Sequence, residues 1–165
     1  MRSVATRRWV VLLLMLALAG CASAPRATSP SIQPADAWAG RISLRVDADQ
    51  PGSFTAAFDL KGNADTGQLS LYAPFGATIA HMLWSPGDAR LQTNGTERSF
   101  SSLEQLAKQA TGADIPIGSL FKWLKGEAAN AQGWQADLSE LSNGRLVARR
   151  SSPAPALELR LVLEQ

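Results

Sequence analysis

The stretch WAGRISLRVD, residues 38–47, alternates inward and outward types of side chain without a break. One face carries Trp38, Gly40, Ile42, Leu44 and Val46, and the other carries Arg41, Ser43, Arg45 and Asp47. A period of two is the spacing of a β-strand that buries one face and exposes the other. The stretch therefore predicts the first strand of a sheet and fixes which of its sides faces the core.

The same pattern continues for the next 50 or so residues. Further strands are predicted over residues 54–60, 69–73, 77–85 and 89–93. Turn-forming residues separate them, and Asn94-Gly95 is a strong hairpin signal. Short strands at spacings of roughly ten residues indicate an antiparallel meander.

The apolar period then becomes helical. Ser101 and Glu104 fit a capping box, and Gly112 fits a helix end, so one helix is predicted between them. A second is predicted over residues 116–125, before Gly126. Its apolar face consists of Ile117, Leu120, Phe121 and Leu124.

Strands return over residues 134–140, 145–149 and 157–164. The order of strands, two short helices and strands predicts a mainly β fold of the α+β type. A helix with one apolar stripe must bury it against another element. We expect both helices to cover the concave apolar face of the sheet.

The N-terminus carries a different pattern. Arg2, Arg7 and Arg8 precede an apolar run over residues 9–18, and LAGC follows at 18–21. This order is typical of an export signal, and LAGC resembles the lipobox of bacterial lipoproteins. There the signal is cut before the cysteine, which then receives three acyl chains. We expect a signal peptide at residues 1–20, lipidated Cys21 with a flexible tether at 21–37, and a domain at 38–165.

Three other interpretations of Cys21 fit less well. A plain secretory signal would leave it as an unpaired thiol in an oxidising compartment. A membrane-spanning helix needs about 20 apolar residues, and this run is shorter. A buried core cysteine would lie in a periodic segment, whereas Cys21 adjoins a polar, Pro- and Ser-containing stretch.

Charge and composition exclude some classes of function. The 16 basic residues fall to 13 without Arg2, Arg7 and Arg8, against 14 acidic ones, so the mature charge is −1. The predicted domain has no cluster of Lys and Arg, so we expect no nucleic-acid partner. His81 is the single histidine and has no Cys or Asp at ligand spacing. We expect no enzyme, metal or cofactor, and a hydrolase that uses His81 is the alternative.

Apolar residues are the more informative candidates. Phe75 lies between Pro74 and Gly76, at the break between two predicted strands. Either this loop folds back and buries the ring in the core, or the ring projects and enters a membrane or a partner. The apolar rows of the strands leave a similar choice between a filled core and one with a cavity.

Several blocks together resemble one family. They are W-x-G-R-I from Trp38, L-x-L-x-x-P-F-G from Leu69, and I-P-I at Ile115 followed by L-x-x-W-L-x-G from Leu120. Over residues 38–134 the chain resembles the LolB family of outer-membrane lipoprotein receptors. The resemblance implies an antiparallel half-open β-barrel with an apolar cavity lidded by short helices.

The resemblance also implies a function. Members take triacylated lipoproteins from the periplasmic carrier LolA and deliver them to the inner leaflet of the outer membrane, without ATP or catalytic residues. Their protruding loop has an apolar tip, usually Leu, which Phe75 matches here. Ala22, where Asp would favour the inner membrane, favours the outer one. We expect a monomer; the alternative is an outer-membrane scaffold lipoprotein with a filled core.

The site residues that follow from the resemblance form three groups. Lipidation falls on Cys21, and the membrane-insertion loop is Pro74, Phe75 and Gly76. The expected acyl-cavity residues are Phe54, Phe58, Leu69, Leu71, Ile117, Leu120, Phe121 and Leu124.

Overall fold

One antiparallel sheet forms most of the domain in the computed structural model, which describes residues 37–47, 52–112 and 114–164. The strands are β1 Ala37–Asp47, β2 Gly52–Gly62, β3 Gly67–Tyr72, β4 Thr78–Ser85, β5 Asp88–Thr93, β6 Thr96–Phe100, β7 Trp134–Asp137, β8 Arg145–Arg150 and β9 Ala156–Leu163. The helices are α2 Leu103–Thr111 and α3 Ile117–Leu124, with a 3₁₀ turn, η2, at Leu141–Asn143. The predicted mainly β fold is confirmed.

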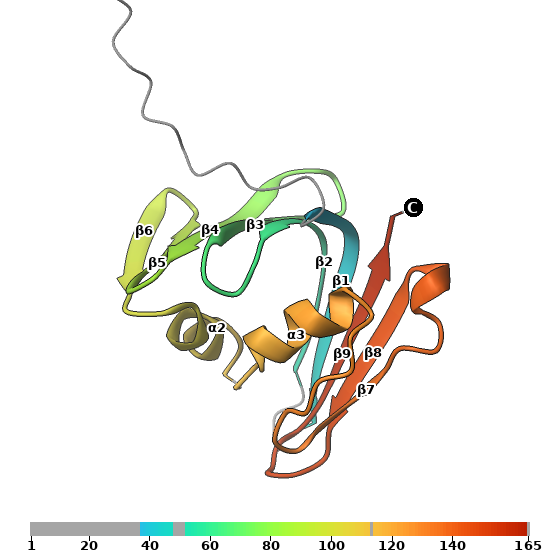
Figure 1. Cartoon of the computed structure of the whole chain (residues 1–165). Helices are drawn as coiled ribbons and strands as arrows, with labels where there is room; N and C mark the ends of the chain where they lie inside the picture. The colour runs from blue at the N-terminus through green and yellow to red at the C-terminus, as the bar shows by residue number, and fades with distance from the viewer. Residues whose placement is uncertain (1–36, 48–51, 113, 165) are drawn as a thin grey trace, which may run out of the picture. The chain divides into compact units, whose positions relative to one another are not determined.

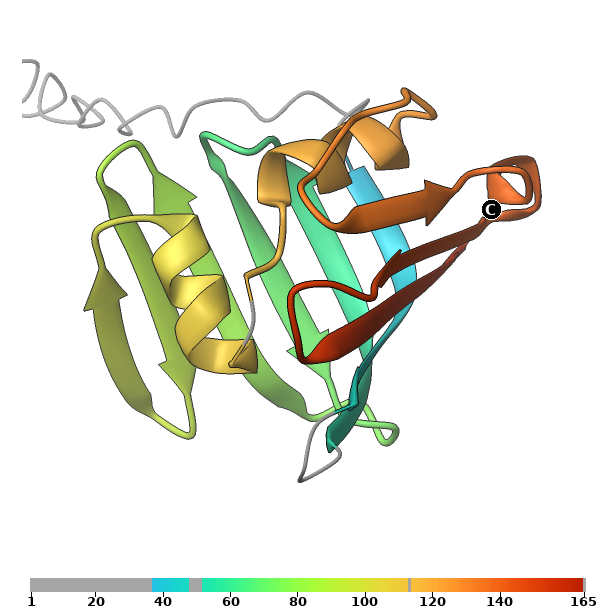
Figure 2. The same cartoon turned by 90° about the horizontal axis from the view of Figure 1, so that it is seen from below.

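Strand β1 lies in the interior of this sheet, between β2 and β9. The spatial order is β6-β5-β4-β3-β2-β1-β9-β8-β7, and β6 and β7 are the two open edges. The sheet curves around α2 and α3, which both lie on its concave side (Figures 1 and 2). The half-open barrel with short helices is therefore confirmed as the fold.

The register of β1 fixes the concave face. Leu44 lies opposite Phe54 on β2 and opposite Leu159 on β9. Because side chains alternate along a strand, a one-residue slip would turn this apolar row toward solvent. The inward residues of β1 predicted from the period of two are the ones that face the helices, and Leu44 and Leu159 are buried.

Helix α2 begins one residue later than predicted. Ser102, not Ser101, is the N-cap: its Oγ accepts a hydrogen bond from the Gln105 N–H at 3.2 Å. The Gln105 side chain in turn accepts from the Ser101 N–H at 3.0 Å. The predicted capping box with Glu104 is wrong, because Gln105, one position later, makes the capping hydrogen bonds instead. Gly112 ends the helix with φ 70°, as its position predicted.

Helix α3 is anchored by aromatic side chains. Phe121 makes an edge-to-face contact with Trp38 at 5.9 Å and a tilted one with Trp84 at 6.4 Å, measured between ring centroids. Trp123 is 1% exposed, and its indole N–H donates to the Ala129 carbonyl at 3.1 Å. The predicted face omitted Trp123, which is the most deeply buried residue of this helix.

Two strands of the structure differ from the sequence prediction. Strand β6 follows the predicted Asn94-Gly95 turn but was not predicted, because its five residues are mostly polar and exposed and show no apolar alternation. The strand predicted over 134–140 ends at Asp137, whose Oδ1 accepts from the N–H and hydroxyl of Ser139 at 3.0 and 2.6 Å. That local turn competes with the ladder and redirects the chain into η2.

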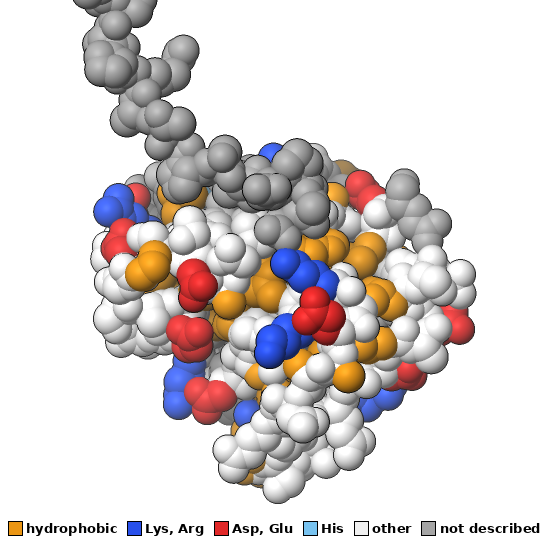
Figure 3. Space-filling model, in the orientation of Figure 1, with side chains coloured by type: hydrophobic (Ala, Val, Ile, Leu, Met, Phe, Trp, Pro, Cys, Tyr) orange, Lys and Arg blue, Asp and Glu red, His pale blue; other side chains and the backbone are white. Residues whose placement is uncertain are grey.

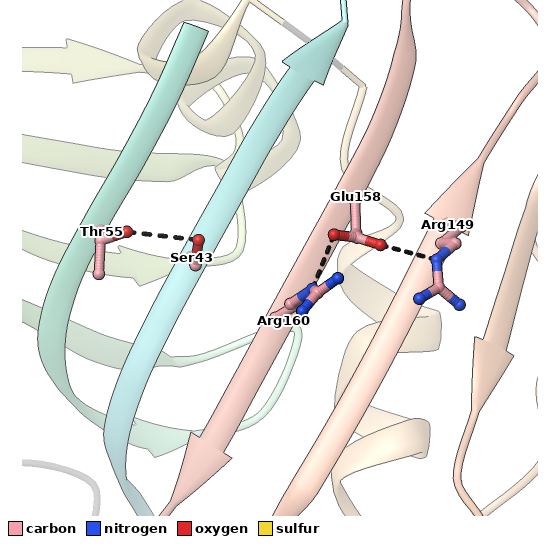
Figure 4. Close-up of polar contacts among 5 residues, drawn as sticks. All are labelled: Ser43, Thr55, Arg149, Glu158 and Arg160. Carbon is pink, nitrogen blue, oxygen red and sulfur yellow. Dashed lines mark hydrogen bonds and ion pairs between the residues drawn. The ribbon is translucent and has the colours of Figure 1, made fainter.

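The convex face of the sheet carries charged and polar groups. On the convex side, Glu158 accepts from Arg149 and Arg160 at 2.7 Å each, and the Thr55 hydroxyl donates to Ser43 (Figure 4). Acidic and basic side chains are interspersed on the surface drawn in Figure 3, with apolar side chains between them. Among the described residues, no helix is both long and apolar enough to cross a membrane.

Glu158 gives the fold a testable pH dependence. The hydrogen bond from Arg160 is the largest cause that lowers the pKa of Glu158 below its ordinary 4.5; partial burial opposes it, and Arg149 adds to it. The stabilisation is present above the unfolded pKa and is lost as the pH falls through the folded value. We expect Glu158→Gln to lower the free energy of unfolding at pH 7 by about 1 kcal/mol or less.

Urea denaturation at pH 7 and pH 3 checks this expectation. Glu97→Gln on the exposed edge strand β6 is the matched control and should change stability little at either pH. A deficit of Glu158→Gln that stays the same at pH 3 would contradict the assignment.

Candidate functional site

The concave face contains an apolar cavity of about 430 Å³ between the sheet and the end of α2. Strands β1 to β5 and α2 contribute Leu44, Phe54, Leu71, Met82, Leu91 and Ala110 to its wall. Ser53, Thr93 and Thr111 are the polar residues of the lining, and none of the described residues that line it is charged. A space of this size and character can hold an apolar ligand but offers nothing to a charged one.

Phe54 marks this cavity as incompletely filled. Its ring is on the inward face of β2, in the same row as buried Ala56 and Phe58. Even so, Phe54 is 40% exposed, because no side chain of the described residues covers it on the cavity side. Covering a large apolar side chain is favourable by about 1.5–3 kcal/mol, so an apolar ligand would gain from contact here.

The eight predicted acyl-cavity residues divide between two places. Phe54 and Leu71 line the 430 Å³ cavity. The other six line a much smaller space of about 70 Å³ under α3; they are Phe58, Leu69, Ile117, Leu120, Phe121 and Leu124. The face of α3 therefore packs as core, and the larger cavity lies beside it under α2.

Sequence reasoning missed several residues of the larger cavity. Three of them lie on strands that the sequence predicted, where the alternation of side chains places them on the inward face: Ala80, Met82 and Leu91. Ala110 was on the predicted apolar stripe of the first helix. The pattern showed which side they face, but not where the packing leaves space.

The loop between β3 and β4 projects from the sheet. Phe75 is fully exposed, so the alternative in which it joins the core is wrong. The Ala73 N–H donates to the Ala77 carbonyl at 2.9 Å, and the Gly76 N–H donates to the Ala73 carbonyl at 2.8 Å. Gly76 has φ 83°, which glycine adopts without strain. Pro74 and Gly76 thus shape a closed turn that carries an apolar ring at its tip.

This loop and the large cavity lie toward the same edge of the sheet. We call it the lower edge, as drawn in Figure 2: it comprises the β3–β4 loop, the Asn94-Gly95 turn and the ends of β1 and β2 at Asp47 and Gly52. Val46 and Gly52 at this edge line the cavity. Ala37, where β1 begins, pairs with Lys61 at the opposite end.

The described residues offer no cluster suited to a metal. No group of three or more His, Cys, Asp and Glu side chains comes together in the part of the chain that the structure describes. His81 lies on β4, where it pairs with Ser70 on β3 and with Gln92 on β5. Its side chain is on the opposite side of the strand from cavity residues Ala80 and Met82. Cys21, the signal peptide and the predicted tether up to residue 36 lie outside the described residues.

An unclosed antiparallel sheet, two covering helices and an apolar hollow define a half-open β-barrel with an apolar cavity. The chain belongs to the family described as "Outer membrane lipoprotein LolB", whose sequence profile matches residues 36–153. The family resemblance expected from the sequence is confirmed.

Relatives named "Outer-membrane lipoprotein LolB" support this membership. The protein of Bordetella petrii is 29% identical over 184 aligned positions, covering 96% of this chain and 92% of the relative. That of Chromohalobacter salexigens is 33% identical, covering 81% and 68%. That of Chromobacterium violaceum is 30% identical, covering 73% and 68%.

Filling the large cavity tests whether it holds an apolar ligand. We expect Ala80→Phe to weaken binding of a fluorescent fatty acid about tenfold, which corresponds to losing contact with about two CH₂ groups. Ala57→Phe makes the same change on the exposed side of β2 and should leave the affinity unchanged. Equal affinities of the two variants, measured by fluorescence titration, would contradict the assignment. A wild-type protein that binds no probe would favour a scaffold with a filled core.

Proposed function

We propose that the protein accepts lipoproteins from a LolA-type periplasmic carrier and inserts them into the inner leaflet of the outer membrane. The observation that carries this proposal is the 430 Å³ apolar cavity with half-exposed Phe54 in its wall, in a chain of the LolB family. Its volume falls within the range of about 300–1,000 Å³ that ligand pockets occupy. The ligand is the acyl part of a triacylated lipoprotein.

The energetics of acyl chains determine how the transfer occurs. Each CH₂ group exposed to water costs about 0.8 kcal/mol, so chains do not pass freely through the periplasm. The carrier therefore presents its opening directly to the cavity, and the chains move from one apolar interior to the other. The transfer has a direction because the acyl chains bind more tightly to this protein than to the carrier, and more tightly still to the bilayer. The transfer requires no ATP, cofactor or catalytic residue.

Phe75 provides the contact with the bilayer in this proposal. It is fully exposed at the tip of a closed turn and lies at the lower edge, which the cavity also reaches. A Phe side chain gains about 1.5–3 kcal/mol on leaving water. Insertion of this ring brings the cavity next to the leaflet, where the acyl chains leave it.

The N-terminal segment places the protein at its destination. Residues 1–20 act as the signal peptide, and lipidated Cys21, followed by Ala22, anchors the protein to the outer membrane, where it faces the periplasm as a monomer. Strand β1 has 11 residues and spans roughly 36 Å, with the anchor attached at its Ala37 end. Fully extended, residues 22–36 reach roughly 54 Å at most. The tether is thus long enough for the lower edge to face the membrane that holds the anchor.

Phe75→Glu tests the insertion step. A charged tip loses the gain from burying the ring, so we expect delivery of lipoprotein into liposomes to slow about tenfold or more. Acceptance from the carrier should stay unchanged, because the cavity wall is intact. Leu83→Glu replaces another exposed apolar residue, on β4, and should deliver normally. Normal delivery by Phe75→Glu would overturn the role of the loop.

Shortening the tether tests the arrangement of anchor and lower edge. We expect deletion of residues 24–33 to reduce delivery to the membrane that holds the anchor, because the remaining tether cannot pass the length of β1. The same deletion in a soluble Cys21→Ala protein should leave delivery unchanged. Acyl-probe binding should be equal in all four proteins. An unimpaired anchored deletion would show that the tether length does not matter.

A further inference from the structure

A second hollow, separate from the acyl cavity, lies around Arg150. Arg150 is the last residue of β8 and lies on the same side of that strand as buried Leu146 and Ala148. It therefore occupies an inward position in an otherwise apolar row and is 6% exposed. Arginine is rarely buried to this extent unless its guanidinium is paired.

The pairing of this guanidinium is incomplete. Nη2 donates to the Pro155 carbonyl at 3.3 Å, and the guanidinium carbon lies 5.8 Å from the centroid of the Trp134 ring. Nε is buried and has no acceptor in the part of the chain that the structure describes. Among the described residues, no carboxylate forms an ion pair with Arg150. A buried, charged donor without an acceptor calls for a partner.

The hollow beside Arg150 has a volume of about 350 Å³, and we call it the Arg150 pocket. Its other lining residues are Asp114, Ile115, Pro116, Gln132, Trp134 and Pro153. The Asp114 carboxylate pairs with Lys108 Nζ at 3.0 Å and forms no ion pair with Arg150. The two hollows have no lining residue in common: Ala110 lines the acyl cavity, whereas Asp114 lines this pocket.

We propose that the Arg150 pocket binds one carboxylate of a partner polypeptide, either an acidic side chain or a C-terminus. A guanidinium presents N–H groups in a planar fork that matches the two oxygens of a carboxylate. A single negative charge balances the single unpaired cation. Ile115, Pro116 and Pro153 supply apolar walls for the aliphatic stem that carries the carboxylate.

The recessed position of Arg150 favours a side chain over a lipid headgroup. With 6% of the residue exposed and Nε covered, the ligand must be slender enough to enter the pocket. A carboxylate on a short aliphatic stem meets that requirement. A phosphodiester fixed in the plane of a bilayer would have to carry its glycerol into the hollow.

Side-chain NMR of the soluble mature chain (Cys21→Ala) tests this site with acetate as the probe. We expect the Nε–H signal of Arg150 to shift saturably, together with the indole N–H signal of Trp134. The Nε–H signal of Arg149, exposed and paired on the convex side, is the internal control and should not follow the same curve. No saturable shift of Arg150, or an equal shift of both arginines, would overturn the proposal.

Two further measurements distinguish a carboxylate from a lipid phosphate as the ligand and test whether the guanidinium of Arg150 binds it. Vesicles containing phosphatidylglycerol should leave the Arg150 signal unchanged; a shift with vesicles but not with acetate would replace the carboxylate by a lipid phosphate and overturn the proposal. Arg150→Lys keeps the charge but loses the fork, so the acetate affinity read at Trp134 should fall about tenfold. An unchanged affinity in a folded Arg150→Lys protein would also overturn it.

Discussion

The concave face of an unclosed sheet has to be covered, and this constraint determines the rest of the structure. Most of the nine strands contribute apolar side chains to this face, and β1 is paired on its two sides by β2 and β9. A closed barrel or a second sheet would bury that face completely. Here two helices of nine and eight residues are available instead. Helix α3 packs closely through Phe121 and Trp123, whereas α2 leaves the larger cavity beside it.

The two faces and the lower edge of the sheet differ in chemical character. The convex side carries charged groups such as Glu158 and its two arginines, which keep that side in water. The concave side holds the apolar cavity, whose described lining residues carry no charge. The acyl cavity extends to the lower edge, and the exposed ring of Phe75 lies at the same edge. The proposed function uses this arrangement as the place where acyl chains enter from a carrier and leave into a bilayer.

The sequence predicted the elements well where the apolar period was strong. The alternation in β1 and β2 identified their inward residues, and the helical spacing identified both helices. It missed β6, because an edge strand without an apolar face has no period to detect. It also missed the division between the two cavities and the inward position of Arg150. Those features depend on how far the sheet curves and how closely each helix packs, which are long-range properties that local spacing does not encode.

The central claim is that acyl chains occupy the cavity between β1–β5 and α2. The most direct measurement transfers a lipoprotein with a photoreactive acyl chain from its carrier to this protein and then maps the cross-linked residues by mass spectrometry. The account predicts cross-links to Phe54, Met82 and Leu91, with far fewer in the Ala80→Phe protein. Cross-links confined to the convex side, or cross-linking that Ala80→Phe leaves unchanged, would contradict it.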